Sequence, residues 1–340
     1  MQRLMAILGA ILYLCLTSPT LADTLVERMA FWRKQAFVCT DVSGKAFPSK
    51  EQALTGYPPT TCDDGDMTLF NGLLCSVGEQ AGCDAVVNSQ DVNGRWWRSP
   101  RRIGMEYVSG RVDVSFSADQ SRGALLYALT KNDPSRLAAY ANWIMQHRPC
   151  LVDIGGCRIY GWPRLCTDDA SDLRCTFRPW TCVTFQLAGK RLSVASADVC
   201  GAALKLLKLD VPDFFFATSQ LEGKVAAYAS GSAVVNDPGY PLHLAAVDLF
   251  ILERLGYSAG VVKAGGAILA AREPLNPFFQ YLAGADTAKI TELVMDECPS
   301  SAKPSRSKFQ WSWEREMSTK PWEDSMYWDC IFIGRLLGAP

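Results

Sequence analysis

The chain has few of the residues that hold catalytic metals and no marked excess of charge. Its 340 residues include two histidines, His147 and His243, and none of its 13 cysteines stands in a C-x-x-C pair. Histidine and cysteine at short spacing are typical of zinc sites, so the sequence predicts no metal site and no cofactor. The formal net charge is −1 and no basic stripe stands out, which argues against nucleic acid as a partner.

Long hydrophobic runs are also missing, except for one at the N-terminus. Residues 5–16 are apolar, Arg3 precedes them, and Thr20-Leu21-Ala22 offers small residues for cleavage. This pattern is typical of a secretory signal peptide, and the apolar run is short for a membrane span. We interpret residues 1–22 as a signal and expect the mature chain, 23–340, to be periplasmic or secreted, without a stable membrane span.

Cysteine is abundant by contrast. Without Cys15 of the signal, an even set remains, at positions 39, 62, 75, 83, 150, 157, 166, 175, 182, 200, 298 and 330. An even number of cysteines in an exported chain is typical of a disulfide framework. Proximity favours the pairs Cys75–Cys83 and Cys298–Cys330, and the other pairings stay open.

Hydrophobic residues spaced three and four apart dominate the chain and predict helices. The predicted helices cover residues 24–37, 66–80, 117–131, 134–147, 198–209, 241–255, 260–272, 286–296 and 322–338. We therefore expect an all-α fold, a single domain over 23–340 in which helical hairpins close into an (α/α) toroid. A layered helical bundle is the alternative.

One segment departs from this helical pattern. Residues 150–182 hold five cysteines with glycine and proline between them. We interpret about 150–200 as a cysteine-rich insertion stapled by disulfides, with a short β-hairpin in residues 176–196, around Gly189-Lys190.

Two acidic motifs at the heads of predicted helices resemble a known enzyme family. The first is Ser117-Ala118-Asp119-Gln120-Ser121-Arg122-Gly123, followed by a helical pair with Asn132-Asp133 at its break and Trp143 in its second helix. It resembles the acid-bearing hairpin of family 8 glycoside hydrolases. Asp64-Gly65-Asp66 resembles the DGD motif of the same family, although here it precedes the acid motif. Ala118 stands where the family has glutamate, so the neighbouring Asp119 is the candidate acid.

The resemblance implies an (α/α)6 toroid that hydrolyses the glycosidic bonds of a polysaccharide. Such hydrolysis uses two carboxyl groups, here Asp119 as the acid and Asp66 or Asp64 as the base that activates water. Gln120 and Arg122 then orient the substrate or face the core. The alternative interpretation of the three carboxylates is that they cap helices or lie in a first helical turn.

Aromatic residues concentrate in two further places. Arg95-Trp96-Trp97-Arg98, with Arg101 beyond it, suggests a sugar-stacking platform with donors for hydroxyl or acidic groups. Packing of arginine on tryptophan without a ligand is the alternative. The second concentration runs from Trp311 to Asp329 and begins with Trp311, Trp313 and Glu314, which are candidates for substrate binding. Glu314 or Asp324 is an alternative catalytic carboxylate.

Two other functions fit the same sequence. A polysaccharide lyase acting on an acidic glycan would use Tyr127, Tyr240 or His243 as its base. A non-catalytic exported protein that binds glycans or partners would keep the cleft and use the carboxylates as caps. All three hypotheses have a polysaccharide or oligosaccharide as the leading partner, and the geometry around Asp119 is what distinguishes them.

Overall fold

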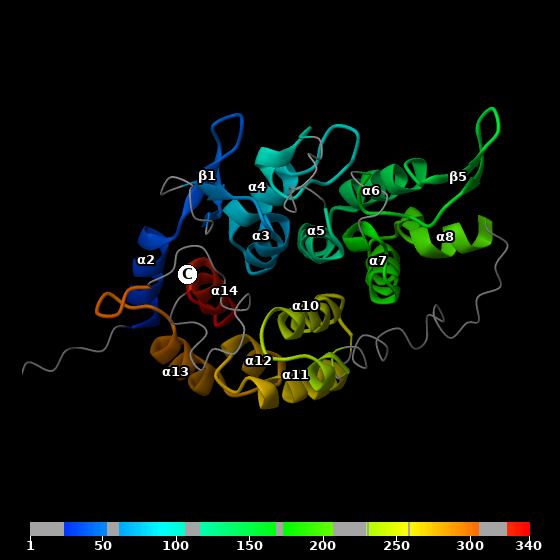
Figure 1. The fold of residues 1–340 in the computed structure, drawn as a ribbon. Helices are drawn as coiled ribbons and strands as arrows, with labels where there is room; N and C mark the ends of the chain where they lie inside the picture. The colour runs from blue at the N-terminus through cyan, green and yellow to red at the C-terminus, as the bar shows by residue number, and fades with distance from the viewer. Residues whose placement is uncertain are drawn as a thin grey trace, which may run out of the picture.

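The computed structural model describes residues 24–52, 61–105, 116–167, 173–206, 229, 231–257, 259–305 and 325–340. Within these ranges the chain is mostly helical, with three small antiparallel sheets of two strands each (Figure 1). The helical class predicted from the hydrophobic spacing is therefore confirmed.

The bounds of the elements agree with most of the predicted helices. The α-helices are α2 (Leu25–Gln35), α3 (Met67–Ser76), α4 (Gln80–Asn88), α5 (Ala118–Lys131), α6 (Pro134–Gln146), α7 (Pro179–Arg191), α8 (Val199–Leu206), α10 (Tyr240–Arg254), α11 (Ala259–Arg272), α12 (Pro277–Leu282), α13 (Thr287–Glu297) and α14 (Trp328–Leu336). The strand pairs are β1 (Val38–Thr40) with β2 (Ala46–Pro48), β3 (Lys50–Glu51) with β4 (Cys62–Asp63), and β5 (Cys150–Asp153) with β6 (Cys157–Tyr160). Short 3₁₀ helices are η1 (Pro100–Arg102), η2 (Leu173–Cys175) and η3 (Ala195–Ala197).

Helices that are buried on most sides alternate along the chain with helices that bury one face. Every residue of α3 is buried, as are most residues of α5, α7, α10, α12 and α14. The helices between them, such as α4, α6, α11 and α13, bury a narrower stripe, as amphipathic surface helices do. Figure 1 shows α3, α5, α10 and α14 toward the middle of the molecule, with α4 and α6 above them and α11 and α13 below. The last helix, α14, packs against α2 and α3 near the start of the chain.

Helices α3 and α5 cross at two glycines. A Cβ atom on Gly123 would lie 2.0 Å from the Thr68 carbonyl oxygen, and one on Gly72 would lie 2.2 Å from the Gly123 Cα. Only a residue without a side chain lets the two backbones approach this closely. The crossing fixes the N-terminal ends of α3 and α5 beside each other.

Six disulfides join the cysteines within the described residues. The pairs are Cys39–Cys62, Cys75–Cys83, Cys150–Cys157, Cys166–Cys175, Cys182–Cys200 and Cys298–Cys330. The two pairs expected from proximity are confirmed, and a set of this size is typical of oxidising compartments. None of the helices in the described ranges has the length and apolarity needed to cross a membrane.

The prediction of a β-hairpin around Gly189-Lys190 is wrong, because that segment belongs to helix α7. Pro179 occupies its first turn, where proline is favoured, and Phe185 is buried in the core. A Cβ atom on Gly189 would lie 2.7 Å from the Val194 carbonyl oxygen, so the glycine serves close packing. The exposed part of the cysteine-rich region is the β5–β6 hairpin, whose two cysteines are joined to each other.

Candidate functional site

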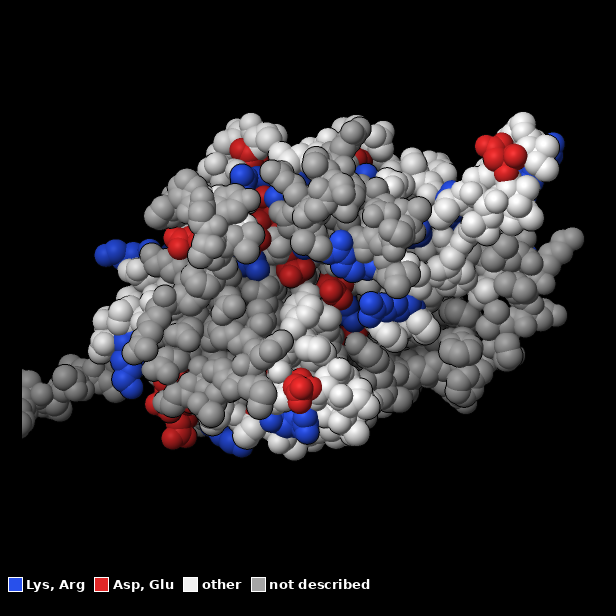
Figure 2. All heavy atoms as spheres, in the orientation of Figure 1, with Lys and Arg blue, Asp and Glu red and all other residues white. Residues whose placement is uncertain are grey.

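The N-terminal ends of three inner helices line one cavity of about 410 Å³. Its lining residues are Ser117, Ala118 and Asp119 at α5, Arg178 and Trp180 at α7, Tyr240, Pro241 and Leu244 at α10, and Arg174 and Asn236 from the connecting segments. A helix N-terminus carries a partial positive charge, so this end of the molecule favours anionic groups. Figure 2 shows acidic and basic side chains gathered in the middle of one face, over the region of α5 and α10.

Asp119 reaches the cavity from the first turn of α5 and is held by an arginine on the same helix. Arg122 Nη1 donates to Asp119 Oδ1 at 3.0 Å. The same guanidinium donates to both carboxylate oxygens of Asp248 on α10, at 2.7 and 2.8 Å. Because Arg122 and Asp248 are buried, Arg122 faces the core and orients Asp119. Asp248, which the sequence analysis did not select, joins α5 to α10 at the edge of the site.

Asp66 lies beside the acid motif, so the two motifs meet. It is the residue before α3, with a φ of 60° in the left-handed region that aspartate tolerates better than most residues. Its Oδ1 accepts a hydrogen bond from Gln120 Nε2 at 2.5 Å and lies 3.8 Å from Arg98 Nη1. Gln120 directly follows Asp119, and its side-chain oxygen accepts from the Thr68 backbone N–H at 3.2 Å. One fully buried glutamine thereby joins the helix ends that carry Asp66 and Asp119.

Asp64 has a different environment from Asp66. Its side chain is 3% exposed, and it accepts hydrogen bonds from Ser99 Oγ at 2.7 Å and Arg101 Nη1 at 3.3 Å. Arg102 Nε lies 3.1 Å from the same carboxylate. Burial raises the pKa of Asp64, although Ser99 and both arginines act in the opposite direction. The carboxylate of Asp64 anchors η1, and neither Asp64 nor Asp66 is among the residues that line the cavity.

The two tryptophans expected to form a sugar platform are buried instead. Trp96 is fully buried, and its Nε1 donates to the Val86 carbonyl oxygen at 3.1 Å. Trp97 Nε1 donates to Asp91 at 2.9 Å, and the Arg95 guanidinium lies 3.8 Å from the centre of the Trp97 ring. This is the arginine–tryptophan packing of the alternative interpretation, and the ring that lines the cavity is Trp180.

The first residues of the second aromatic concentration, Trp311, Trp313 and Glu314, lie outside the described residues, as does Asp324. The structure therefore leaves their roles in substrate binding or catalysis as predictions.

Of the three bases considered for a lyase, Tyr240 alone lines the cavity. The Tyr127 hydroxyl donates to Asp133 Oδ2 at 2.8 Å, at the C-terminal end of α5. His243 is fully buried beside Phe278, with 5.5 Å between the ring centres. Burial, and to a lesser degree the charge of Arg122, holds the pKa of His243 well below its usual value, so this imidazole is neutral and enclosed.

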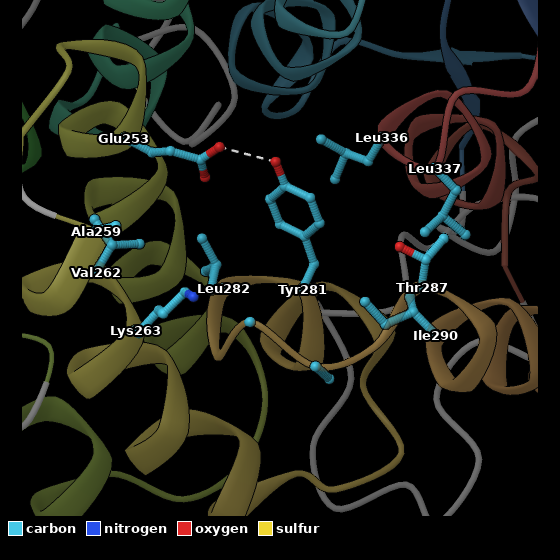
Figure 3. Close-up of a pocket in the computed structure, with 12 residues that line it drawn as sticks. Glu253, Ala259, Val262, Lys263, Tyr281, Leu282, Thr287, Ile290, Leu336 and Leu337 are labelled. Atoms are coloured by element: carbon cyan, nitrogen blue, oxygen red, sulfur yellow. Dashed lines mark hydrogen bonds between the residues drawn. The ribbon is translucent and has the colours of Figure 1, made fainter.

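A second cavity, of about 350 Å³, lies where the inner helices α10, α12 and α14 end (Figure 3). Tyr281 points toward Glu253 and donates a hydrogen bond to its Oε1 at 2.8 Å. Burial and the Glu253 charge raise the pKa of Tyr281 to about 12. Most other lining residues are apolar, and Glu253 is the one carboxylate among them. The first cavity is also lined by one carboxylate, Asp119, but there a second carboxylate, Asp66, is hydrogen-bonded to the neighbouring residue Gln120. A reaction that needs two carboxyl groups therefore fits the first cavity better.

No family model, curated protein or solved structure matches the chain. Among the described residues, no group of three or more His, Cys, Asp or Glu side chains is arranged to hold a metal ion. The chemistry of the site is therefore argued from its own side chains.

Proposed function

We propose that this protein is an exported enzyme that hydrolyses the glycosidic bonds of a polysaccharide, with Asp119 as the acid and Asp66 as the base. One observation carries the proposal: Asp119 lines a cavity at the N-terminal ends of inner helices, and Asp66 is hydrogen-bonded to the residue next to it. The disulfides and the signal-like N-terminus support export.

The alternation of inner and outer helices supports an (α/α) toroid as the architecture. Among the described residues, the outer helices α4, α6, α11 and α13 are each followed in the chain by an inner one, and α14 packs on α2 and α3. In such a ring the inner helices point the same way, so their N-terminal ends surround one cleft. The positions of Asp66 at α3, Asp119 at α5 and Tyr240 at α10 fit this arrangement.

The contacts of the two carboxylates leave one oxygen atom of each available for proton transfer. Asp119 Oδ1 is held by Arg122, and Asp66 Oδ1 by Gln120, while the Oδ2 atom of each has no hydrogen-bond partner among the described residues. Their side chains are 30% and 20% exposed, against 3% for Asp64. In the division of roles that the motif resemblance implies, Asp119 would protonate the leaving oxygen and Asp66 would take a proton from the attacking water. Asp66 is therefore a better candidate base than Asp64.

The test is to replace each carboxylate by its amide and to measure release of reducing ends from acidic and neutral polysaccharides. We expect Asp119→Asn and Asp66→Asn each to lower turnover by about 100-fold or more, because each loses a proton-transfer group. Asp84→Asn is the matched control, since Asp84 is exposed on the outer helix α4, and it should keep wild-type turnover. Thermal unfolding of each variant checks that the fold is intact. Wild-type rates in both variants would exclude the proposed pair.

A lyase is the second candidate, because Tyr240 lines the cavity together with Arg174 and Arg178. A lyase removes the proton on the carbon next to a sugar carboxylate and expels the glycosidic oxygen, leaving a carbon–carbon double bond in the product. The ultraviolet absorbance of that product distinguishes elimination from hydrolysis. Loss of activity in Tyr240→Phe together with unchanged activity in Asp66→Asn would favour the lyase. Binding of a glycan without formation of a hydrolysis or elimination product would favour the third hypothesis, a non-catalytic binding protein.

A further inference from the structure

The segment that leads into α10 forms one wall of the first cavity. Its residues that line the cavity are Asn236, Tyr240, Pro241 and Leu244. Gly239, the residue before α10, is buried and has a φ of 121° and a ψ of −146°. Glycine adopts this conformation far more readily than other residues. The position of the wall therefore depends on the contacts that hold the Gly239 backbone.

The carboxylate of Glu273 holds that backbone. Glu273 directly follows α11, and α11 packs against α10 (Figure 1). Its Oε1 accepts a hydrogen bond from the Gly239 N–H at 2.9 Å, and its Oε2 accepts one from Asn276 Nδ2 at 3.3 Å. Asn276 is buried and caps α12, because its side-chain oxygen accepts from the Phe278 and Phe279 N–H groups. One carboxylate thus joins the start of α10, the end of α11 and the start of α12.

A second contact from the end of α11 supports the same wall. Arg272 Nη2 donates to the Asn236 carbonyl oxygen at 2.9 Å. Asn236 Nδ2 in turn donates to Ser232 Oγ at 2.9 Å, and Ser232 Oγ donates to the Pro241 carbonyl oxygen at 3.4 Å. The Arg272 contact is exposed, whereas that of Glu273 is partly buried. Because a hydrogen bond is stronger where water is kept from it, Glu273 is the more important support.

The charge of Glu273 decides whether both of its hydrogen bonds can form. An ionised carboxylate accepts at both oxygens, whereas a protonated one carries a hydroxyl donor on one of them. Gly239 and Asn276 both donate, so a proton on either oxygen displaces one of them. Burial raises the pKa of Glu273 above its ordinary 4.5, although the two hydrogen bonds and the charge of Arg272 act in the opposite direction. One bond is therefore lost at milder acidity than an exposed glutamate would require.

We propose that Glu273 is a positioning residue for the cavity, because its carboxylate fixes the start of α10 and thereby places Tyr240 in the lining. Acid then loosens this wall, while Asp66 and Asp119 stay at the ends of α3 and α5. Control of turnover by this wall rests on the proposed function, whereas the hydrogen bond to Gly239 and its dependence on pH do not.

The Gly239 amide reports the hydrogen bond directly. Pro238-Gly239 is the one Pro-Gly pair in the sequence, so labelling proline with carbonyl ¹³C and glycine with ¹⁵N assigns this amide in an NMR spectrum. We expect its proton shift to titrate in the wild type with a midpoint above the ordinary 4.5 of a glutamate. Glu273→Gln should abolish this titration, because an amide does not ionise. Glu292→Gln, which removes an exposed carboxylate of α13, is the matched control and should leave the titration unchanged.

Hydrogen exchange measures the wall itself. The His243 N–H donates to the Gly239 carbonyl oxygen at 3.1 Å, in the first turn of α10. In Glu273→Gln at neutral pH, the amides of this turn should exchange about tenfold faster than in the wild type, because local opening costs less where a supporting bond is lost. The amides of α13 should exchange at the wild-type rate.

Kinetics on a cleaved polysaccharide test the effect on the site. Glu273→Gln should raise KM by about threefold or more at neutral pH and leave kcat within about twofold, because the wall binds substrate and the two aspartates do not move. The KM of the wild type should approach that of the variant as the pH falls, since a protonated glutamate resembles glutamine. A purely structural role would lower the melting temperature without this convergence.

Four results would each overturn the positioning role. They are a Gly239 amide that does not titrate in the wild type, a titration that persists in Glu273→Gln, equal exchange at the start of α10 in both proteins, and turnover with an equal KM in both. Failure of the proposed function gives a different result. In that case the wild type cleaves no polysaccharide, yet the titration and the exchange still depend on Glu273.

Discussion

Asp64 and Asp66 belong to one short motif, and their surroundings give them different chemistry. Asp64 is enclosed by Ser99, Arg101 and Arg102, whereas Asp66 contacts Gln120 beside the cavity residue Asp119. Two positions along the chain therefore separate a carboxylate that anchors a loop from one that is accessible to water. At the scale of single residues, burial and hydrogen-bond donors decide what a carboxylate can do.

The raised pKa of Asp64 predicts how the free energy of unfolding varies with pH. Its value in the folded protein exceeds the ordinary 3.8 because of burial. The folded state therefore binds this proton more tightly than the unfolded state does. Its contribution to stability is fully present below the unfolded pKa and is lost as the pH rises through the folded pKa. The free energy of unfolding of the wild type should therefore rise relative to that of Asp64→Asn as the pH falls from neutrality toward about 4.

Urea unfolding of both proteins over that pH range measures the difference. Asp84→Asn on the exposed face of α4 serves as the control for removal of a carboxylate. A difference between wild type and Asp64→Asn that stays constant with pH, or that shrinks toward acid, would contradict the prediction.

The crossing of α3 and α5 is the element-scale feature on which the site depends. Gly123→Ala places a methyl group within 2.6 Å of both the Thr68 carbonyl carbon and the Leu69 Cα, so the helices must separate. We expect a loss of about 1–3 kcal/mol in the free energy of unfolding, as for other overpacked contacts. Turnover should also fall, because separation of the helices moves Asp66 away from Gln120.

Gly231→Ala is the matched control for this crossing. Gly231 is helical and exposed, and a Cβ atom there meets nothing within 4 Å. Alanine should therefore stabilise the protein, by up to about 1 kcal/mol. Chemical denaturation compares the two variants, and equal stability of Gly123→Ala and wild type would show that the helices tolerate the added methyl group.

Amphipathic helices could be predicted from the sequence because their apolar spacing is a local property. Helix α7 could not, since its Val, Thr, Phe and Trp residues favour strands and Gly189-Lys190 suggests a turn. Its helical state depends on packing partners such as Val194 and Ala197, next to Gly189. Helix α12 is short and follows a proline-rich connection, so its apolar spacing covers too few residues to stand out.

The candidate site was predictable only in part. Its carboxylates belong to recognisable motifs, and Gln120 joins the two. Arg174, Arg178 and Trp180 were missed because their segment was interpreted as an insertion outside the core. Trp96 and Trp97 were wrongly expected to face the cleft. Adjacent tryptophans between arginines suit sugar binding, but packing against remote residues such as Val86 and Tyr140 encloses Trp96.

At the scale of the whole molecule, hydrogen bonds join residues near the start of the described chain to residues near its end. Trp328 Nε1 of α14 donates to the Phe37 carbonyl oxygen at 2.7 Å, and Trp32 Nε1 of α2 donates to that of Pro299 at 2.7 Å. Arg28 Nη1 donates to the Cys298 carbonyl oxygen at 3.1 Å. Figure 1 shows the C-terminus beside α14, on the side of α2. The packing of α14 and α13 against α2 thus depends on contacts between residues far apart in sequence.

The Cys298–Cys330 disulfide reinforces this packing, so its loss should lower the free energy of unfolding more than the loss of a peripheral disulfide. It spans 32 residues and joins the end of α13 to α14, where both sulfurs are buried. Loop entropy predicts a loss of about 3–4 kcal/mol for the Cys298→Ala/Cys330→Ala double variant. The Cys150–Cys157 bond spans 7 residues of the exposed β5–β6 hairpin, so the corresponding double variant should lose about 2.4 kcal/mol or less. Urea unfolding without reductant compares the two variants, and a greater loss in the hairpin variant would mean that the disulfide between α13 and α14 contributes little to stability.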